Sequence, residues 1–358
     1  MEFTKNDMKM SKGVAILLML LLHLFCRKEV NGLYETSPLI NGVPLMYYIG
    51  LFGDACVPIY CFASGYGLFL SIKNAQGEIL KKNVKRILKL LINYWIILVL
   101  FVSLGFFVGD TQVYPGSLTK FLLNFFVISS SYNGAWWFMQ TYIILVILSP
   151  VLTKIINKYN SYFIIFISGI IYLFAYIQRI KHTINFGDNS VISMIINSIV
   201  LVGTSQLPYI VGSIFAKERI YSKIFNAFSR LTLKNYICLA IILLLLLFHS
   251  FYESMIIAPI TGITFICVFI LIDKKVLINK IFKFFGDHST NIWLTHMFFY
   301  LTIFPKMTFE PYFPILIFCW LLIMCLISSF IIHLIYKPII HYIDNKINNV
   351  HYIKKDVI

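Results

Sequence analysis

The stretch Lys12-Gly-Val-Ala-Ile-Leu-Leu-Met-Leu-Leu-Leu-His23 places a cation and an imidazole at the two ends of an unbroken apolar run. An α-helix turns ~100° and rises ~1.5 Å per residue, so the eleven steps from Lys12 to His23 end about 20° past three full turns and ~16 Å further along the axis. The two side chains therefore share one helix face, about half a bilayer apart. An ionisable group inside a membrane span is costly, and its presence indicates a function.

The composition of the whole chain is that of a membrane protein. Of the 358 residues, 59% are hydrophobic and only 13% are charged, which is too apolar for a soluble domain of this length. Since the hydrocarbon layer is ~30 Å thick, each spanning helix needs ~20 residues. We predict an all-α polytopic membrane protein that forms a single integral domain over residues 1–358. Its ten predicted spans lie near 10–27, 44–71, 88–108, 135–153, 162–178, 191–216, 235–250, 255–272, 290–305 and 313–335.

The net charge of +15 is distributed in a way that argues against nucleic acid as a partner. If the N-terminus is cytoplasmic and the connections alternate, inner segments carry 24 of the 30 Lys and Arg residues and outer segments carry six. This bias follows the positive-inside rule over an even number of spans, so both termini are predicted to be cytoplasmic. The apolar N-terminal run lacks a small-residue cleavage site and is predicted to be a retained first span.

Two connections differ from the rest. Residues 73–89 form the most basic loop, on the predicted cytoplasmic side. Residues 118–132 contain an apolar run too short to span, which indicates an interfacial or re-entrant segment on the outer side. The seven cysteines are scattered and form no Cys-x-x-Cys motif, so neither a disulfide framework nor a metal site is predicted.

Ionisable residues inside the predicted spans are few. Asp54 is the one acidic residue well inside a span, His23 and His296 are the two histidines inside spans, and His249 is near a span end. The neutral imidazole of His23 can accept a proton as a general base, or it can donate one interhelical hydrogen bond as a packing contact. Asp54 can orient His23, stabilise its imidazolium, or pair with a hydroxyl group or with another histidine.

Lys12 also has two interpretations. Positive-inside lysines end many first spans, but only fourteen uncharged residues separate Lys12 from Arg27, about 21 Å where ~30 Å is needed. One of these two cations must therefore extend toward the interface or lie in a pocket lined by protein.

Several motifs in order along the chain resemble the membrane acyltransferase 3 family. Lys12 to Ile16 with His23 resembles the first-helix Arg-x10-His pattern, and Phe62-Ala-Ser-Gly-Tyr66 resembles the Phe-x-x-Ser-Gly-Tyr/Phe signature of the second helix. Later matches are Arg86-Ile-Leu-Lys89 before Asn93-Tyr-Trp95, Trp136-Trp-Phe138 with Tyr142 and Pro150, and Gly286-Asp-His-Ser289 followed by His296. Lys12 and Lys89 replace the usual Arg and lack its planar fork, which suits phosphate.

The resemblance implies an enzyme of the bacterial cytoplasmic membrane, acting without a fused esterase-like domain. Such an O-acyltransferase moves an acyl group, commonly acetyl from acetyl-CoA, to a hydroxyl of a cell-surface glycan or lipid-linked saccharide. It needs no metal and can work with polysaccharide assembly machinery. The candidate site residues are catalytic His23 and Asp54, donor-binding Lys12, Arg86, Lys89, Ser64 and Tyr66, and acceptor-binding Trp136, Trp137 and His296; Asp54 is included for its position inside a span, not for a family motif.

A glycan or lipid exporter without chemistry is the alternative from another functional class. Such a protein would also have ten spans, buried polar groups and basic inner loops. Transporters often show repeated halves with Gly- or Pro-broken helices at matching positions, and the sequence shows neither clearly.

Overall fold

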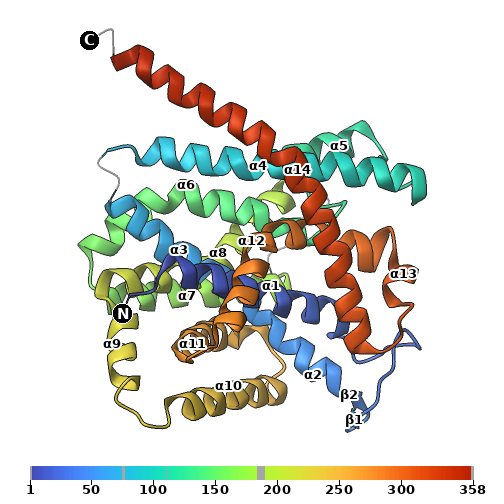
Figure 1. Cartoon of the computed structure of the whole chain (residues 1–358), viewed down its shortest axis with the longest axis horizontal. Coiled ribbons are helices and arrows are strands. Elements are labelled where there is room, and N and C mark those ends of the chain that lie inside the picture. The colour runs from blue at the N-terminus through green and yellow to red at the C-terminus, as the bar shows by residue number, and fades with distance from the viewer. Residues whose placement is uncertain (1, 75–76, 110, 184–189, 356–358) are drawn as a thin grey trace. The chain divides into compact units, whose positions relative to one another are not determined.

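The computed structural model describes residues 2–74, 77–109, 111–183 and 190–355. Nearly all of this chain is helical (Figure 1). The elements are α1 (Lys5–Phe25), β1 (Leu39–Ile40), β2 (Val43–Pro44), α2 (Leu45–Leu51), η1 (Phe52–Ala55), α3 (Cys56–Lys73), α4 (Ile79–Val108), α5 (Leu118–Phe125), η2 (Gly134–Trp136), α6 (Trp137–Lys158), α7 (Ser161–Lys181), α8 (Ser190–Glu218), α9 (Ile220–Phe228), α10 (Lys234–Phe251), η3 (Met255–Ile257), α11 (Ala258–Leu271), α12 (Val276–Met297), the π-helix η4 (Phe298–Thr302), α13 (Pro305–Phe309) and α14 (Pro314–Lys355).

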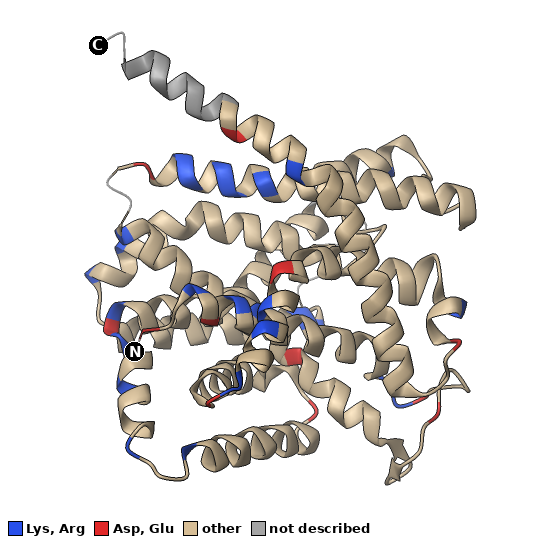
Figure 2. Cartoon of the chain, viewed as in Figure 1, with Lys and Arg blue, Asp and Glu red and all other residues tan. Residues whose placement is uncertain are grey.

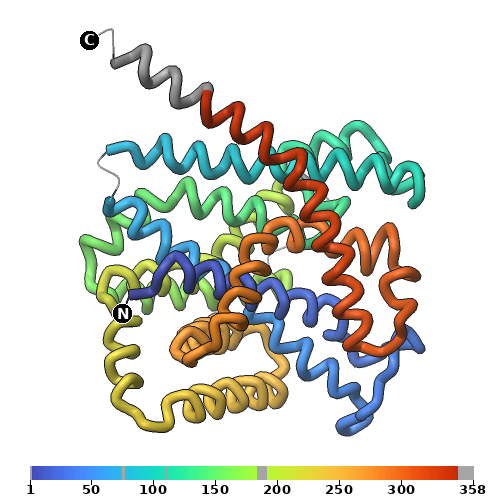
Figure 3. The backbone as a smooth tube through the Cα atoms, in the orientation of Figure 1, coloured from blue at the N-terminus to red at the C-terminus, as the bar shows by residue number. Residues whose placement is uncertain are grey.

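The chain divides into two compact units, each assembled from separate stretches of sequence. Unit 1 comprises Met1–Ile79, Trp137–Thr290 and Tyr312–Phe318. Unit 2 comprises Leu80–Trp136, Asn291–Pro311 and Cys319–Ile358. Figure 3 traces unit 1 from α1 through α2 and η1 into α3, and later through α10 into α11, which pack against each other. That the two units act as one integral domain stays a prediction.

Eight helices are long and apolar enough to cross a membrane, which agrees with the predicted all-α polytopic fold. They are Lys5–Phe25, Leu45–Lys73, Ile79–Val108, Gly134–Lys158, Ser161–Lys181, Ile192–Glu218, Lys234–Phe251 and Pro314–Asn345. Each coincides with one of the ten predicted spans. The chain is therefore a multi-pass membrane protein.

The remaining two predicted spans differ from long apolar helices. The span predicted at 255–272 is the shorter apolar helix Met255–Leu271. The α-helical part of that segment, Ala258–Leu271, rises only ~21 Å over its 14 residues. The span predicted at 290–305 covers the end of α12 and the π-helix η4, and α12 begins well before it in a charged stretch containing Lys280, Lys283 and Asp287.

The predicted non-spanning segment at 118–132 contains α5, a helix of eight residues in unit 2. The hydroxyl of Ser117 accepts a hydrogen bond from the backbone N–H of Lys120 and so caps the first turn. Leu118 and Phe126 are exposed, whereas the ring of Phe125 stacks on Trp95 at 5.0 Å. The structure confirms that this segment is too short to span, and its interfacial position stays a prediction.

Helix α1 is fixed against α12 by a reciprocal pair of glycines within unit 1. A Cβ atom on Gly13 would lie 2.0 Å from the carbonyl oxygen of Phe282, and one on Gly286 would lie 2.1 Å from that of Lys9. Neither position has room for a side chain, so the two backbones approach as closely as helices can. The N-terminus of α1 is closed by a capping box between Thr4 and Asp7.

A second reciprocal pair fixes α3 against α8 in unit 1. A Cβ atom on Gly65 would lie 1.9 Å from the carbonyl oxygen of Tyr209, and one on Gly212 would lie 2.1 Å from that of Phe62. The hydroxyl of Ser213 donates a hydrogen bond to the Gly65 carbonyl at 3.1 Å, across the same crossing. Small residues that allow close backbone approach are a common basis of helix association in membranes.

Gly65→Ala is expected to destabilise the protein, because the added methyl group must push α3 away from the backbone of α8. Overpacking of this kind costs roughly 1–3 kcal/mol. The matched control is Gly169→Ala in α7, where nothing lies within 4 Å of the added atom and Ala favours the helix. The measurement is the thermal unfolding temperature of the purified protein in detergent. A Gly65→Ala protein at least as stable as the Gly169→Ala protein would contradict the close crossing.

Candidate functional site

Lys12 and His23 both lie in α1, which is one continuous α-helix from Lys5 to Phe25. On one side of their shared face is Gly13, which packs on α12. On the other side is Leu22, which contacts Gly53 of η1, where an added Cβ would lie 2.5 Å from the Leu22 Cβ. The hydroxyl of Tyr60 in α3 donates to the Lys12 carbonyl at 3.3 Å. The Lys12–His23 face of α1 therefore lies between its contacts with α12 and with η1 and α3.

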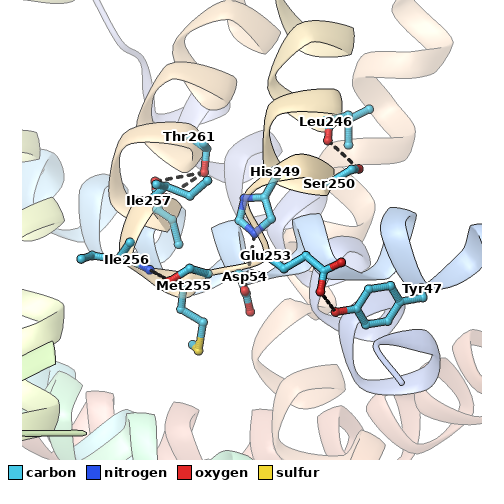
Figure 4. Close-up of polar contacts among 12 residues, drawn as sticks. Tyr47, Asp54, Leu246, His249, Ser250, Glu253, Met255, Ile256, Ile257 and Thr261 are labelled. Atoms are coloured by element: carbon cyan, nitrogen blue, oxygen red, sulfur yellow. Dashed lines mark hydrogen bonds and ion pairs between the residues drawn. The ribbon is translucent and has the colours of Figure 1, made fainter. Parts of the chain in front are cut away.

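Asp54 and His249 form a buried acid–imidazole pair in unit 1 (Figure 4). Asp54 Oδ2 in η1 lies 3.5 Å from His249 Nε2 in α10, and the two side chains are 6% and 0% exposed. Within the part of the chain that the structure describes, neither ring nitrogen of His249 makes a hydrogen bond. The sequence left open whether Asp54 pairs with His23, with a hydroxyl group or with another histidine. The structure places another histidine, His249, beside it. A role of Asp54 in orienting His23 stays a prediction.

A polar clamp secures the segment that follows His249. Glu253, one helical turn further along, pairs with Lys28 Nζ at 2.6 Å and accepts a hydrogen bond from the Tyr47 hydroxyl at 2.9 Å. The bond to Lys28 lowers the pKa of Glu253 and raises the pKa of Lys28, so both groups are charged near neutral pH. The clamp links the residues after α1 and the start of α2 to the loop after α10. The clamp is weakened when Glu253 is protonated in acid or when Lys28 loses its proton in strong base.

His249 was not among the site residues that the sequence predicted. The sequence places it only near a span end, and its partner Asp54 is 195 residues away in sequence. One signal was present in the sequence. Asp54 is the one acid well inside a predicted span, and a buried carboxylate needs a donor or a cation from another helix.

The basic residues predicted to bind the donor in unit 2 contact acidic and amide groups of the same unit. Lys85 Nζ and Lys89 Nζ lie 2.9 and 2.7 Å from the two carboxylate oxygens of Asp344 in α14. Arg86 Nη1 donates to Asn83 Oδ1 at 2.9 Å. Figure 2 shows Lys and Arg residues gathered along the first half of α4. A phosphate at Lys89 would compete with Asp344, and phosphate binding by Arg86 and Lys89 stays a prediction.

Trp136 and His296 fill the core of unit 2. The indole N–H of Trp136 donates to the Leu294 carbonyl at 2.9 Å, and its ring packs on Tyr94 and Phe298. His296 is fully buried, and its Nδ1 lies 2.8 Å from the Trp293 carbonyl. These contacts account for both residues structurally, and their role in acceptor binding stays a prediction.

Tyr66 and Ser64 lie in one turn of α3 in unit 1. The Tyr66 hydroxyl donates to Glu2 Oε2 at 3.0 Å and accepts the backbone N–H of Phe3 at 3.3 Å. The Phe3 ring is buried against the Tyr66 ring at 5.2 Å. Tyr66 thus anchors the segment before α1, while Ser64 is half-buried beside it. That these two residues shape a donor channel stays a prediction.

The sequence model of a family described as an acyltransferase domain matches residues 6–334. The chain belongs to the membrane acyltransferase 3 family. No curated protein matches the chain, and no solved structure matches it either. The match includes Lys12, His23, Asp54 and His249, so this membrane acyltransferase contains every residue of the site within its family domain.

Two glycines in the acyltransferase signatures have a structural role, because they allow neighbouring helices to pack closely. Gly65 of the Ser-Gly-Tyr signature makes the closest contact of α3 with α8, and Gly286 of the later signature makes that of α12 with α1. Because α1 carries Lys12 and His23, the close approach of Gly13 and Gly286 also sets the position of these two candidate site residues.

Proposed function

We propose that this acyltransferase moves an acetyl group from cytoplasmic acetyl-CoA, or another acyl group from its CoA thioester, to a hydroxyl of a cell-surface glycan or lipid-linked saccharide. It would act in the bacterial cytoplasmic membrane. The observation that carries the proposal is the continuity of α1, which holds Lys12 and His23 on one face, ~16 Å apart along the axis. Such a helix links a cation on the cytoplasmic side to a base nearer the outer side.

His23 is the proposed general base. It takes the proton of the acceptor hydroxyl as the oxygen attacks the thioester carbonyl carbon. The carbon–sulfur bond then breaks, and the CoA thiolate receives the proton from the imidazolium. The products are an ester and free CoA, and no metal or redox partner is needed.

Lys12 is the proposed contact for a CoA phosphate in unit 1. Charged hydrogen bonds to phosphate are strong, and the ammonium group supplies the charge without the fork of Arg. The residues on this face between Lys12 and His23, Ile16 and Met19, are apolar and buried, and an apolar lining suits the thin pantetheine arm of the donor.

The direct test compares glycan from wild-type cells with glycan from cells lacking the gene. Mass spectrometry of the isolated saccharides is expected to show a loss of one acyl group per modified sugar, with restoration by the wild-type gene. Identical glycan masses in the two strains would reject the proposed function, and export without modification would instead change the amount of surface glycan.

Lys12→Ala is expected to raise the KM for acetyl-CoA on the order of tenfold, since one charged contact to phosphate is lost. Lys12→Arg is expected to preserve or lower the KM, because Arg restores the planar fork. Both are measured with purified protein under saturating acceptor. An unchanged KM in Lys12→Ala would exclude the phosphate contact.

A further inference from the structure

Arg179 is a cation in the last turn of α7, and the described residues give its guanidinium an aromatic face but no hydrogen-bonded or ion-paired anion. Its guanidinium carbon lies 5.0 Å from the centre of the Trp137 ring, at the start of α6. Both side chains are half-buried and belong to unit 1. Over the described ranges of the chain, the guanidinium has no hydrogen-bond acceptor and no ion-pair partner.

Two carboxylates must be considered as partners of Arg179, and neither forms an ion pair with it. Asp54 is close enough to interact electrostatically with Arg179, but its Oδ2 lies beside His249, 3.5 Å from Nε2, and it makes no hydrogen bond or close ion pair with the guanidinium. Glu253, which precedes the Ser254 that is hydrogen-bonded to Tyr176 of α7, pairs with Lys28 at 2.6 Å. Among the described residues, no group therefore hydrogen-bonds the planar fork of Arg179, whose five N–H donors can bind water or a ligand.

Trp137 prepares this fork for a ligand. The indole face attracts the cation and restrains its side chain, but it accepts no conventional hydrogen bond. A guanidinium with a fixed plane matches two oxygens of one phosphate and loses less side-chain entropy on binding than a free one.

The position of Arg179 along the membrane normal indicates which molecules could supply a phosphate group. The charge distribution places Arg179 and Lys181 on the predicted outer side, at the end of a span. Phosphate groups at that depth belong to molecules with hydrocarbon tails, such as phospholipids and isoprenyl-phosphate carriers.

We propose that Arg179 and Trp137 form a binding site for the phosphate of a membrane amphiphile at the outer end of unit 1. The site takes one phosphate group, with Arg179 as the bidentate donor and Trp137 as the residue that orients it. The inference deepens the proposed function, on which it rests for the view that the bound molecule is a lipid-linked acceptor.

The test measures binding to the full-length protein in dodecyl maltoside, using decaprenyl phosphate as the probe and decaprenol as its uncharged counterpart. Wild-type protein is expected to bind the phosphate more tightly than the alcohol. Arg179→Gln is expected to weaken phosphate binding on the order of tenfold or more and to leave decaprenol binding unchanged. Arg179→Lys is expected to be intermediate, because the charge remains and the fork is lost.

Lys181→Gln is the matched control, since Lys181 is an exposed cation in the same turn of α7. It is expected to bind decaprenyl phosphate as wild type does. Equal unfolding temperatures of all variants show that the site, and not the fold, has changed. The proposal is overturned if Arg179→Gln binds the phosphate as tightly as wild type, or if Lys181→Gln weakens binding equally.

Competition distinguishes the two sources of phosphate. If dioleoyl phosphatidic acid displaces decaprenyl phosphate at equal concentration, the site takes any lipid phosphate and a phospholipid headgroup is a ligand. If it does not, the site selects the isoprenyl carrier of an acceptor. Binding requires no acyl transfer, so failure of the glycan-mass test would reject the proposed function without deciding this site, and the reverse also holds.

Discussion

Replacing His23 with Ala is expected to lower acyl transfer about 10²- to 10⁴-fold, the usual contribution of a general base, while the protein still inserts and purifies normally. The hydroxyl of a sugar is a weak nucleophile until its proton is removed, and no other side chain of the proposed donor path along α1 offers a neutral base. The measurement is the rate of acyl transfer from acetyl-CoA at saturating donor and acceptor.

Two further variants separate the role of a base from that of a packing contact. His23→Gln keeps a polar side chain that can form an interhelical hydrogen bond but cannot take the proton, so it is expected to be as inactive as His23→Ala. His341→Ala removes an exposed imidazole elsewhere and is expected to keep full activity. Full activity of His23→Gln would show that the imidazole only packs, and full activity of a normally inserted His23→Ala would remove it from the mechanism.

His249→Ala is expected to destabilise the protein by roughly 2–5 kcal/mol, the usual cost of truncating a large buried side chain. The Asp54 carboxylate is left in a dry environment, 6% exposed, without the imidazole that lies 3.5 Å away. The loss of the ring also leaves a cavity beside Phe52, whose ring centre lies 5.8 Å from that of His249. The measurement is the free energy of unfolding in detergent.

A double-mutant cycle isolates the pair from the cavity. Asp54→Asn removes the carboxylate charge, so adding it to His249→Ala is expected to cost much less than it does in the wild type. His249→Phe keeps ring volume and is expected to retain the electrostatic part of the loss. Additive effects of Asp54→Asn and His249→Ala would show that the two groups do not interact.

The spans were largely predictable because the cost of a charge and the length of an apolar run are properties of a local stretch of sequence. That reasoning identified eight segments that form long apolar helices. It was less successful for α12, where Lys280, Lys283 and Asp287 lie in the same helix as the apolar residues before Met297. A hydropathy pattern marks where apolar residues gather, whereas a helix continues wherever its backbone hydrogen bonds do.

In the candidate site too, some features follow from local sequence and others only from tertiary structure. Helix periodicity alone determined that Lys12 and His23 share a face of the first span, since both belong to one continuous helix. Only tertiary structure decided that Asp54 lies beside His249, that Gly13 meets the backbone of α12, and that Arg179 lies over Trp137. The period of a single helix fixes the direction of each side chain around its own axis, but which helix lies in that direction depends on the close packing of segments far apart in sequence.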